Sequence, residues 1–112
     1  MTDRSKRVET DVNVYRLLLA ALPGGVVALG WGYPGSTLLR VRILRAPAVG
    51  GTPTVLPVEP PEGDGWEVVY DADTGSFRDR GLPPGSRWRY AVYARDGDGP
   101  WTLWRDEVVT LL

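Results

Sequence analysis

The chain has 112 residues, a length that suits one domain with a core of its own. It contains no cysteine and no histidine, which excludes disulfides and removes the usual metal ligand, general base and pH switch. Its net charge of -1 gives no overall attraction to nucleic acid or to a membrane surface, so we expect neither nucleic-acid binding nor membrane insertion.

Residues 1–11 are polar and charged without any period, and we interpret them as a tail before one domain over residues 12–112. The apolar run after residue 16 is interrupted by Pro23-Gly24-Gly25, and no small-residue cleavage site follows it, so it is not interpreted as a signal peptide. The run is also too short to span a bilayer. A cytoplasmic location is therefore expected if Met1 is the native start, and an extracellular parent protein if it is not.

Alternation of apolar with polar or small residues predicts strands, and no stretch of the chain shows a helical period. Over residues 46–65, five prolines remove backbone donors and exclude a continuous central strand, and only residues 55–58 are expected to add a short edge strand. The main strands are expected at residues 12–22, 27–31, 39–44, 66–70, 76–80, 88–95 and 104–112.

The strongest local pattern covers residues 82–95, where a Pro-Gly corner leads into a strand of strict alternation. A period of two predicts one buried face and one wet face. The buried face is expected to hold Trp88, Tyr90, Val92 and Ala94, and the wet face Arg89, Ala91, Tyr93 and Arg95.

This corner, Leu-x-Pro-Gly-Ser-x-Trp, resembles the E–F corner and F strand of fibronectin type III domains, and residues 27–34 resemble their B strand. The resemblance covers residues 17–112. It implies an all-β fold, an immunoglobulin-like antiparallel β-sandwich of about seven strands. Its core would include Trp31, Leu82, Trp88 and Tyr90. Trp88 takes the place of the family's corner tyrosine, so the hydroxyl bond of that corner must be replaced by the indole N–H or lost.

Two pairs of carboxylates are spaced closely enough to suggest chemistry, Asp71 with Asp73 and Asp96 with Asp98. Such pairs occur in glycosidases and calcium loops. Both pairs lie in glycine-containing turns, where aspartate is favoured for its bonds to the backbone, and Leu82 stands where a calcium loop needs glutamate. We therefore expect no catalytic residue, no metal site and no cofactor.

Arginines form the first candidate binding face. If the strands at residues 39–44 and 88–95 are neighbours, as the resemblance implies, one outer sheet face carries Arg40, Arg42, Arg89, Tyr93 and Arg95. Such a set suits carboxylates, phosphates or an anionic polysaccharide. The alternative is an ordinary solvent face, paired with acids such as Glu67 or Asp71. The charged Asp79 is expected to bind the corner backbone or an arginine.

Three tryptophans at strand ends or in a turn form the second candidate site: Trp66, Trp101 and Trp104. Exposed indoles there would stack on sugar rings or anchor a partner. For Trp101 the resemblance implies instead a lid over the end of the core.

We therefore expect a non-catalytic module that mediates protein–protein interaction or structural assembly, its partner being another protein or copies of itself. The contact surface would be the arginine face or the turn at residues 96–100. The alternatives are a carbohydrate-binding accessory domain that uses the exposed tryptophans, and a passive spacer of a larger extracellular protein.

Overall fold

The computed structural model describes residues 16–32, 39–48 and 54–112, so the expected tail lies outside the described residues. Within them the chain forms seven strands and no helix, and hence no helix that could cross a membrane. The strands are β1 (Arg16–Leu22), β2 (Val26–Gly32), β3 (Leu39–Pro47), β4 (Glu67–Ala72), β5 (Ser76–Asp79), β6 (Arg87–Asp96) and β7 (Thr102–Thr110).

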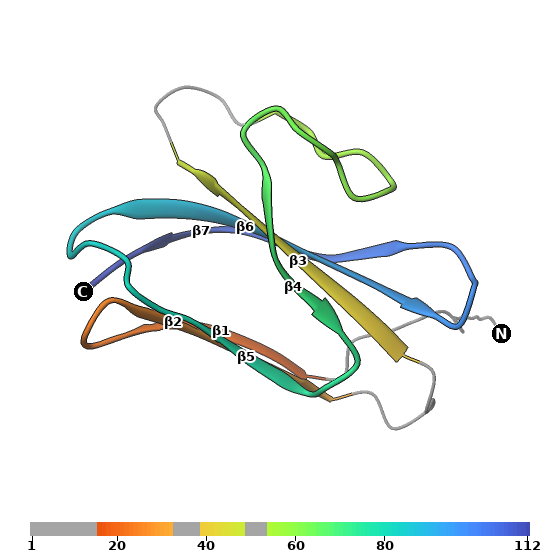
Figure 1. Cartoon of the computed structure of the whole chain (residues 1–112), viewed down its shortest axis with the longest axis horizontal. Helices are drawn as coiled ribbons and strands as arrows, with labels where there is room; N and C mark the ends of the chain where they lie inside the picture. The colour runs from red at the N-terminus through yellow and green to blue at the C-terminus, as the bar shows by residue number, and fades with distance from the viewer. Residues whose placement is uncertain (1–15, 33–38, 49–53) are drawn as a thin grey trace, which may run out of the picture.

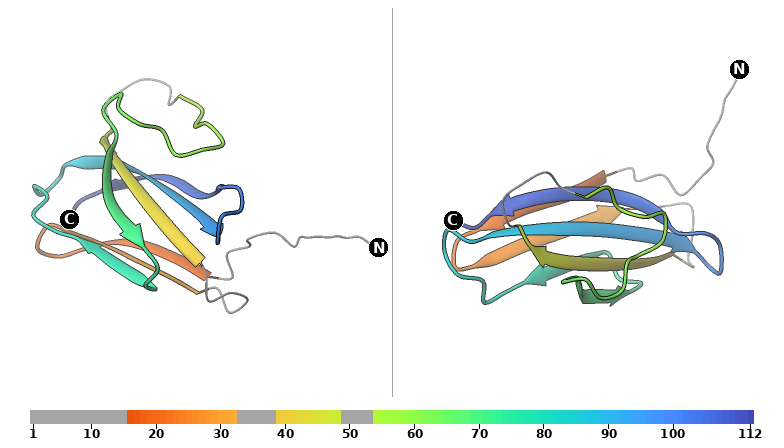
Figure 2. Two further views of the ribbon diagram at one scale, coloured as in Figure 1. Left: turned by 45° about the vertical axis from the view of Figure 1, so that its right-hand side comes forward. Right: turned by 90° about the horizontal axis from the view of Figure 1, so that it is seen from above.

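Two antiparallel sheets pack face to face (Figure 1), one with the order β1-β2-β5 and the other with the order β4-β3-β6-β7. This arrangement confirms the predicted all-β fold, an immunoglobulin-like antiparallel sandwich of seven strands. The predicted edge strand at residues 55–58 is wrong, because no strand forms over residues 54–66. That segment instead crosses the outside of the four-stranded sheet, on the side away from β1, β2 and β5 (Figures 1 and 2).

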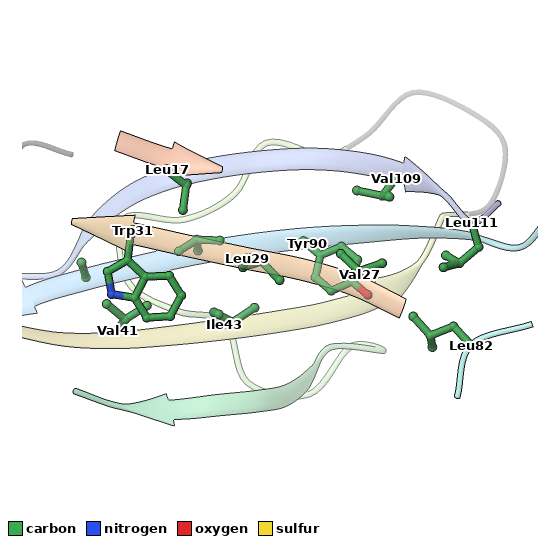
Figure 3. Close-up of a cluster of buried hydrophobic side chains, with 12 residues drawn as sticks. Leu17, Val27, Leu29, Trp31, Val41, Ile43, Leu82, Tyr90, Val109 and Leu111 are labelled. Carbon is green, nitrogen blue, oxygen red and sulfur yellow. The ribbon is translucent and has the colours of Figure 1, made fainter. Parts of the chain in front are cut away.

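Inward-facing residues of both sheets form the main core (Figure 3). As predicted, Trp31 and Leu82 are buried and Tyr90 has no exposed surface, while Trp88 is half-buried against the same cluster. The remaining buried members are Leu17, Val27, Leu29, Val41, Ile43, Val92, Ala94, Val109 and Leu111.

A second cluster lies on the outer face of the four-stranded sheet, and it corrects the prediction that this face is wet. Ala91 and Tyr93 have no exposed surface, and Leu44 on β3 is 1% exposed. The side chains packed against them are Leu56, Trp66 and Trp101. We call these six residues the outer core. Leu44, Ala91 and Tyr93 are buried because the proline-rich segment folds back over the sheet instead of pairing with its edge.

The corner before β6 keeps its hydrogen bond despite the missing tyrosine. The Trp88 indole N–H donates to Ser86 Oγ over 2.9 Å, and Ser86 Oγ donates to the Pro83 carbonyl over 2.6 Å. The indole therefore replaces the hydroxyl, one of the two outcomes expected from the sequence. Gly85 allows the turn because its φ of 75° belongs to the left-handed region that glycine tolerates.

Replacing Ser86 with alanine is expected to lower the free energy of unfolding by about 1–2 kcal/mol, because it removes both bonds and leaves the half-buried indole N–H without its acceptor. Urea denaturation measures the change. Ser76→Ala on β5 is the control, since that exposed hydroxyl makes no hydrogen bond within the described residues. Equal, small effects of the two substitutions would show that the corner relay does not stabilise the fold.

The two sheets also meet along one edge of the sandwich. β1 and β7 are the edge strands on that side, and their arrows point the same way in Figure 3. Arg105 on β7 donates to the Leu17 carbonyl on β1 over 3.2 Å. One backbone acceptor of an edge strand is thereby satisfied by the opposite sheet, a contact that makes pairing with a foreign strand less favourable at this point.

Candidate functional site

Strand register places the predicted arginine face on the outside of the four-stranded sheet. Arg40 lies opposite Arg95 and Arg42 opposite Tyr93 across β3 and β6, and Arg89 lies farther along the same face of β6. The five residues therefore share one face, as the sequence predicted. The placement of Tyr93 on the solvent side is wrong, because its ring belongs to the outer core.

Most of these arginines are already paired with carboxylates. Arg40 and Arg42 donate through Nε to the two oxygens of Asp71, over 2.5 and 3.0 Å. Arg89 holds both oxygens of Asp106, over 2.8 and 2.7 Å. Bidentate pairing of this kind fixes the guanidinium in one plane. The outer face is thus closer to the paired solvent face that the sequence analysis gave as its alternative than to an open anion site.

The two neighbouring arginines change the pKa of the Asp71 carboxylate. Partial burial favours its neutral form, but the hydrogen bonds and charges of Arg40 and Arg42 outweigh burial and hold the pKa of Asp71 below its ordinary value of 3.8. A carboxylate whose pKa is lower in the folded state stabilises the fold above the unfolded pKa. That stabilisation is lost as the pH falls through the folded pKa.

The Asp71→Asn variant is therefore expected to show a flatter dependence of stability on pH than the wild type, in the window from about pH 5 downward. Thermal unfolding between pH 6 and pH 2 measures it. The double variant Arg40→Gln/Arg42→Gln should remove or reverse the Asp71 part of this pH dependence, because burial then acts on the pKa of Asp71 without the opposing arginines. A curve for Asp71→Asn as steep as that of the wild type would contradict this account.

The three candidate tryptophans are all half-buried. Two guanidinium groups contact the Trp101 ring, with Arg42 Cζ at 4.9 Å and Arg95 Cζ at 4.6 Å from its centroid. Arg89 Cζ lies 5.4 Å from the centroid of Trp66, and Trp104 packs against the main core. Trp101 is a lid, but it covers the outer core and not the end of the main core, which corrects that part of the expectation.

Residues 54–65, which we call the pinned segment, are held on the sheet by three contacts. Leu56 inserts into the outer core, the Tyr93 hydroxyl donates to the Pro57 carbonyl over 2.8 Å, and Arg89 donates to the Thr54 carbonyl over 2.7 Å. These anchors leave the two valines on either side of Leu56 and Pro57 facing solvent, with Val55 90% and Val58 76% exposed. The sequence did not predict this surface, since its only signal there is an apolar pair inside a proline-rich stretch.

An ionic network, of which the sequence predicted only an arginine partner for Asp79, joins the two sheets. Arg45 on β3 donates to both oxygens of Asp79 on β5, over 2.9 and 2.8 Å, and the Tyr90 hydroxyl donates to Asp79 over 2.8 Å. Asp79 is 6% exposed. Burial and the Asp79 carboxylate raise the pKa of Tyr90, which keeps its phenol protonated as a donor. Of the two partners expected for Asp79, the arginine is confirmed. The contacts of Asp79 hold β5 against β3 and β6 of the other sheet.

One pocket of about 420 Å³ opens at the end of the sandwich where β3 begins and β6 ends. Its lining residues are Leu39, Arg40, Asp71, Ala72, Asp73, Arg95, Gly97 and Asp98. Three aspartates contribute to it, yet no group of three acidic side chains within the described residues is placed to hold a metal ion. The pocket is lined by positively and negatively charged side chains.

Comparison with known proteins bears on the fold alone. No family model and no curated protein matches the chain. Among solved structures, the twitchin kinase region from C. elegans (Fn31-NL-kin-CRD-Ig26) is similar over 86% of this chain, with a TM-score of 0.51 and 15% sequence identity. The chain corresponds to 15% of the length of that structure. The similarity supports the immunoglobulin-like sandwich already defined by the strand order.

Proposed function

We propose that the chain is a fibronectin type III-like module without catalytic activity, and that it mediates protein–protein interaction or structural assembly through the pinned segment. The observation that carries the proposal is the solvent exposure of Val55 and Val58 on a segment that is itself anchored to the sheet. A segment that is fixed before binding loses less conformational entropy when a partner docks on it.

The surroundings of the pinned segment support a protein partner. Register places three further exposed apolar side chains on this outer side: Val68 opposite Leu44, Leu103 opposite Tyr93, and Val108 opposite Arg89. Among the described residues, the only other exposed large apolar side chains are Leu18 on β1 and Leu112, the last of the described residues. Apolar exposure concentrated on one side, with paired arginines around it, matches the anatomy of a protein interface.

The carbohydrate-binding alternative has less support. It needs indole faces open to a sugar ring, whereas the Trp66 and Trp101 rings are contacted by guanidinium groups and Trp104 packs on the main core. The spacer alternative makes the opposite prediction from ours, since it requires no partner at Val55 or Val58.

Site-specific photo-crosslinking tests the proposal. A photoreactive amino acid is placed at Val55, and in a matched control at Arg78, an exposed position on β5 in the other sheet. We expect the probe at position 55, in cells that produce the protein, to capture a defined partner that the probe at position 78 does not capture. Excess unmodified protein should compete with this capture, and the Val58→Asp substitution should abolish it.

Light scattering across a wide concentration range separates the two kinds of partner. If the captured species is a second copy, the purified protein should form a defined oligomer that Val55→Asp/Val58→Asp dissolves. If it is another protein, the purified chain should stay monomeric. A monomer that yields no specific crosslink at position 55 would favour the spacer and overturn the proposal.

A further inference from the structure

The pocket at the end of the sandwich contains charged side chains that are not all paired with other described residues. Its Asp71 carboxylate is already bound by Arg40 and Arg42. What remains is one cation, Arg95, and two exposed carboxylates, Asp73 and Asp98, none of which makes an ion pair with another described residue. Within the part of the chain that the structure describes, the pocket charges outside ion pairs are therefore of both signs and line one hollow.

Arg95 lies against an aromatic ring and keeps a donor without an acceptor. Its guanidinium lies 4.6 Å from the centroid of the Trp101 ring, and its Nε is buried without a hydrogen-bond acceptor. Stacking on an aromatic ring restricts the plane of the guanidinium while leaving the fork of N–H donors available to a carboxylate. The other arginines of the outer face, Arg40, Arg42 and Arg89, already have a carboxylate in that fork.

We propose that this pocket binds a zwitterionic group in which a carboxylate stands next to a cation. Arg95 takes the carboxylate, and Asp73 and Asp98, which line the same pocket, take the cation. A simple anion is disfavoured because the two aspartates repel it, and a simple cation leaves the Arg95 guanidinium without a carboxylate partner. The volume of about 420 Å³ is near the lower end for ligand pockets and suits a ligand of amino-acid size. This site shares no residue with the pinned segment, so a test that fails for one proposal does not bear on the other.

Nuclear magnetic resonance titration tests the site, with the Trp101 indole N–H signal as the local reporter. The first probe is free L-arginine, which carries both charges. The second is an Arg-Asp dipeptide with both ends blocked, which offers the same charges from side chains. L-arginine amide and N-acetylalanine are the controls, since the first lacks the carboxylate and the second lacks the cation.

We expect a saturable shift of the Trp101 signal with at least one zwitterionic probe and a shift at least ten times weaker with either control. Binding of free L-arginine alone would identify a small-molecule ligand, and binding of the blocked dipeptide would identify a segment of a protein. The Arg95→Gln variant should lose the response, whereas Arg87→Gln, at an exposed position on β6 outside the pocket, should keep it. Asp73→Asn/Asp98→Asn, which changes exposed turn residues only, should weaken binding by at least tenfold and guards against a folding defect in Arg95→Gln.

Two results would overturn the proposal. One is the absence of a saturable shift with both zwitterionic probes. The other is a response that persists unchanged in Arg95→Gln and in Asp73→Asn/Asp98→Asn.

Discussion

The Asp79→Ala variant is expected to lose about 3–5 kcal/mol of its free energy of unfolding, a large share of the stability of a domain of this size. The substitution removes the acceptor of both Arg45 and the Tyr90 hydroxyl, leaving the hydroxyl buried and the Arg45 guanidinium with only the exposed Glu67. Leaving these donors without a buried acceptor costs far more than the ion pair itself contributes, which is why the single substitution has so large an effect.

Glu67→Ala is the matched control for this prediction. Glu67 binds the same guanidinium over 2.6 Å, but its side chain is 65% exposed, so its removal should cost less than about 1 kcal/mol. Equilibrium denaturation in urea measures both variants. A similar small loss for Asp79→Ala and Glu67→Ala would show that water reaches Asp79 and that the network is not a buried one.

Tyr93→Ala is expected to destabilise the fold by a similar amount, about 3–5 kcal/mol, because it empties the centre of the outer core. The substitution also removes the hydroxyl that holds Pro57. We therefore expect the pinned segment to become open to proteolysis in this variant under conditions where the wild type is resistant. Urea denaturation and limited proteolysis give the two measurements.

Tyr93→Phe separates packing from hydrogen bonding. It keeps the ring in the outer core and removes only the bond to the exposed Pro57 residue, so the loss should be at most about 1 kcal/mol. If Tyr93→Ala were also this mild, the outer face would be an ordinary wet face, as its alternation suggests, and the outer core would not contribute to stability.

The positions of the strands could be predicted from the sequence because they depend on local alternation. Val27, Leu29 and Trp31 fill the main core at every second position, and the Pro-Gly corner fixes where β6 begins. The outer core could not be predicted in this way. Tyr93 and Arg89 follow the alternation of a wet face, and their burial depends on contacts with Pro57 and Thr54, which lie 36 and 35 residues away in the chain.

In the candidate site, too, local alternation predicts some features, whereas others depend on contacts between distant residues. The sharing of one face by Arg40, Arg42 and Arg95 follows from strand parity and was predicted. The partner of each arginine was only partly accessible: Asp71 was named for this face, whereas Asp106 was not, because the choice depends on the register with β7. Arg45 was missed altogether, since β3 was expected to end before it, and an arginine that faces the space between two sheets breaks the alternation rule.

The neighbouring edges of β1 and β7 have a mechanical consequence. Because the two strands point the same way, the beginning of β1 and the end of β7 lie at opposite ends of the sandwich (Figure 3). Tension applied between Arg16 and Leu112 would run along the strands, perpendicular to the hydrogen bonds that join β1 to β2 and β6 to β7. Those bonds would be sheared together instead of being opened one after another, so the sandwich would resist stretching if its two ends were tethered.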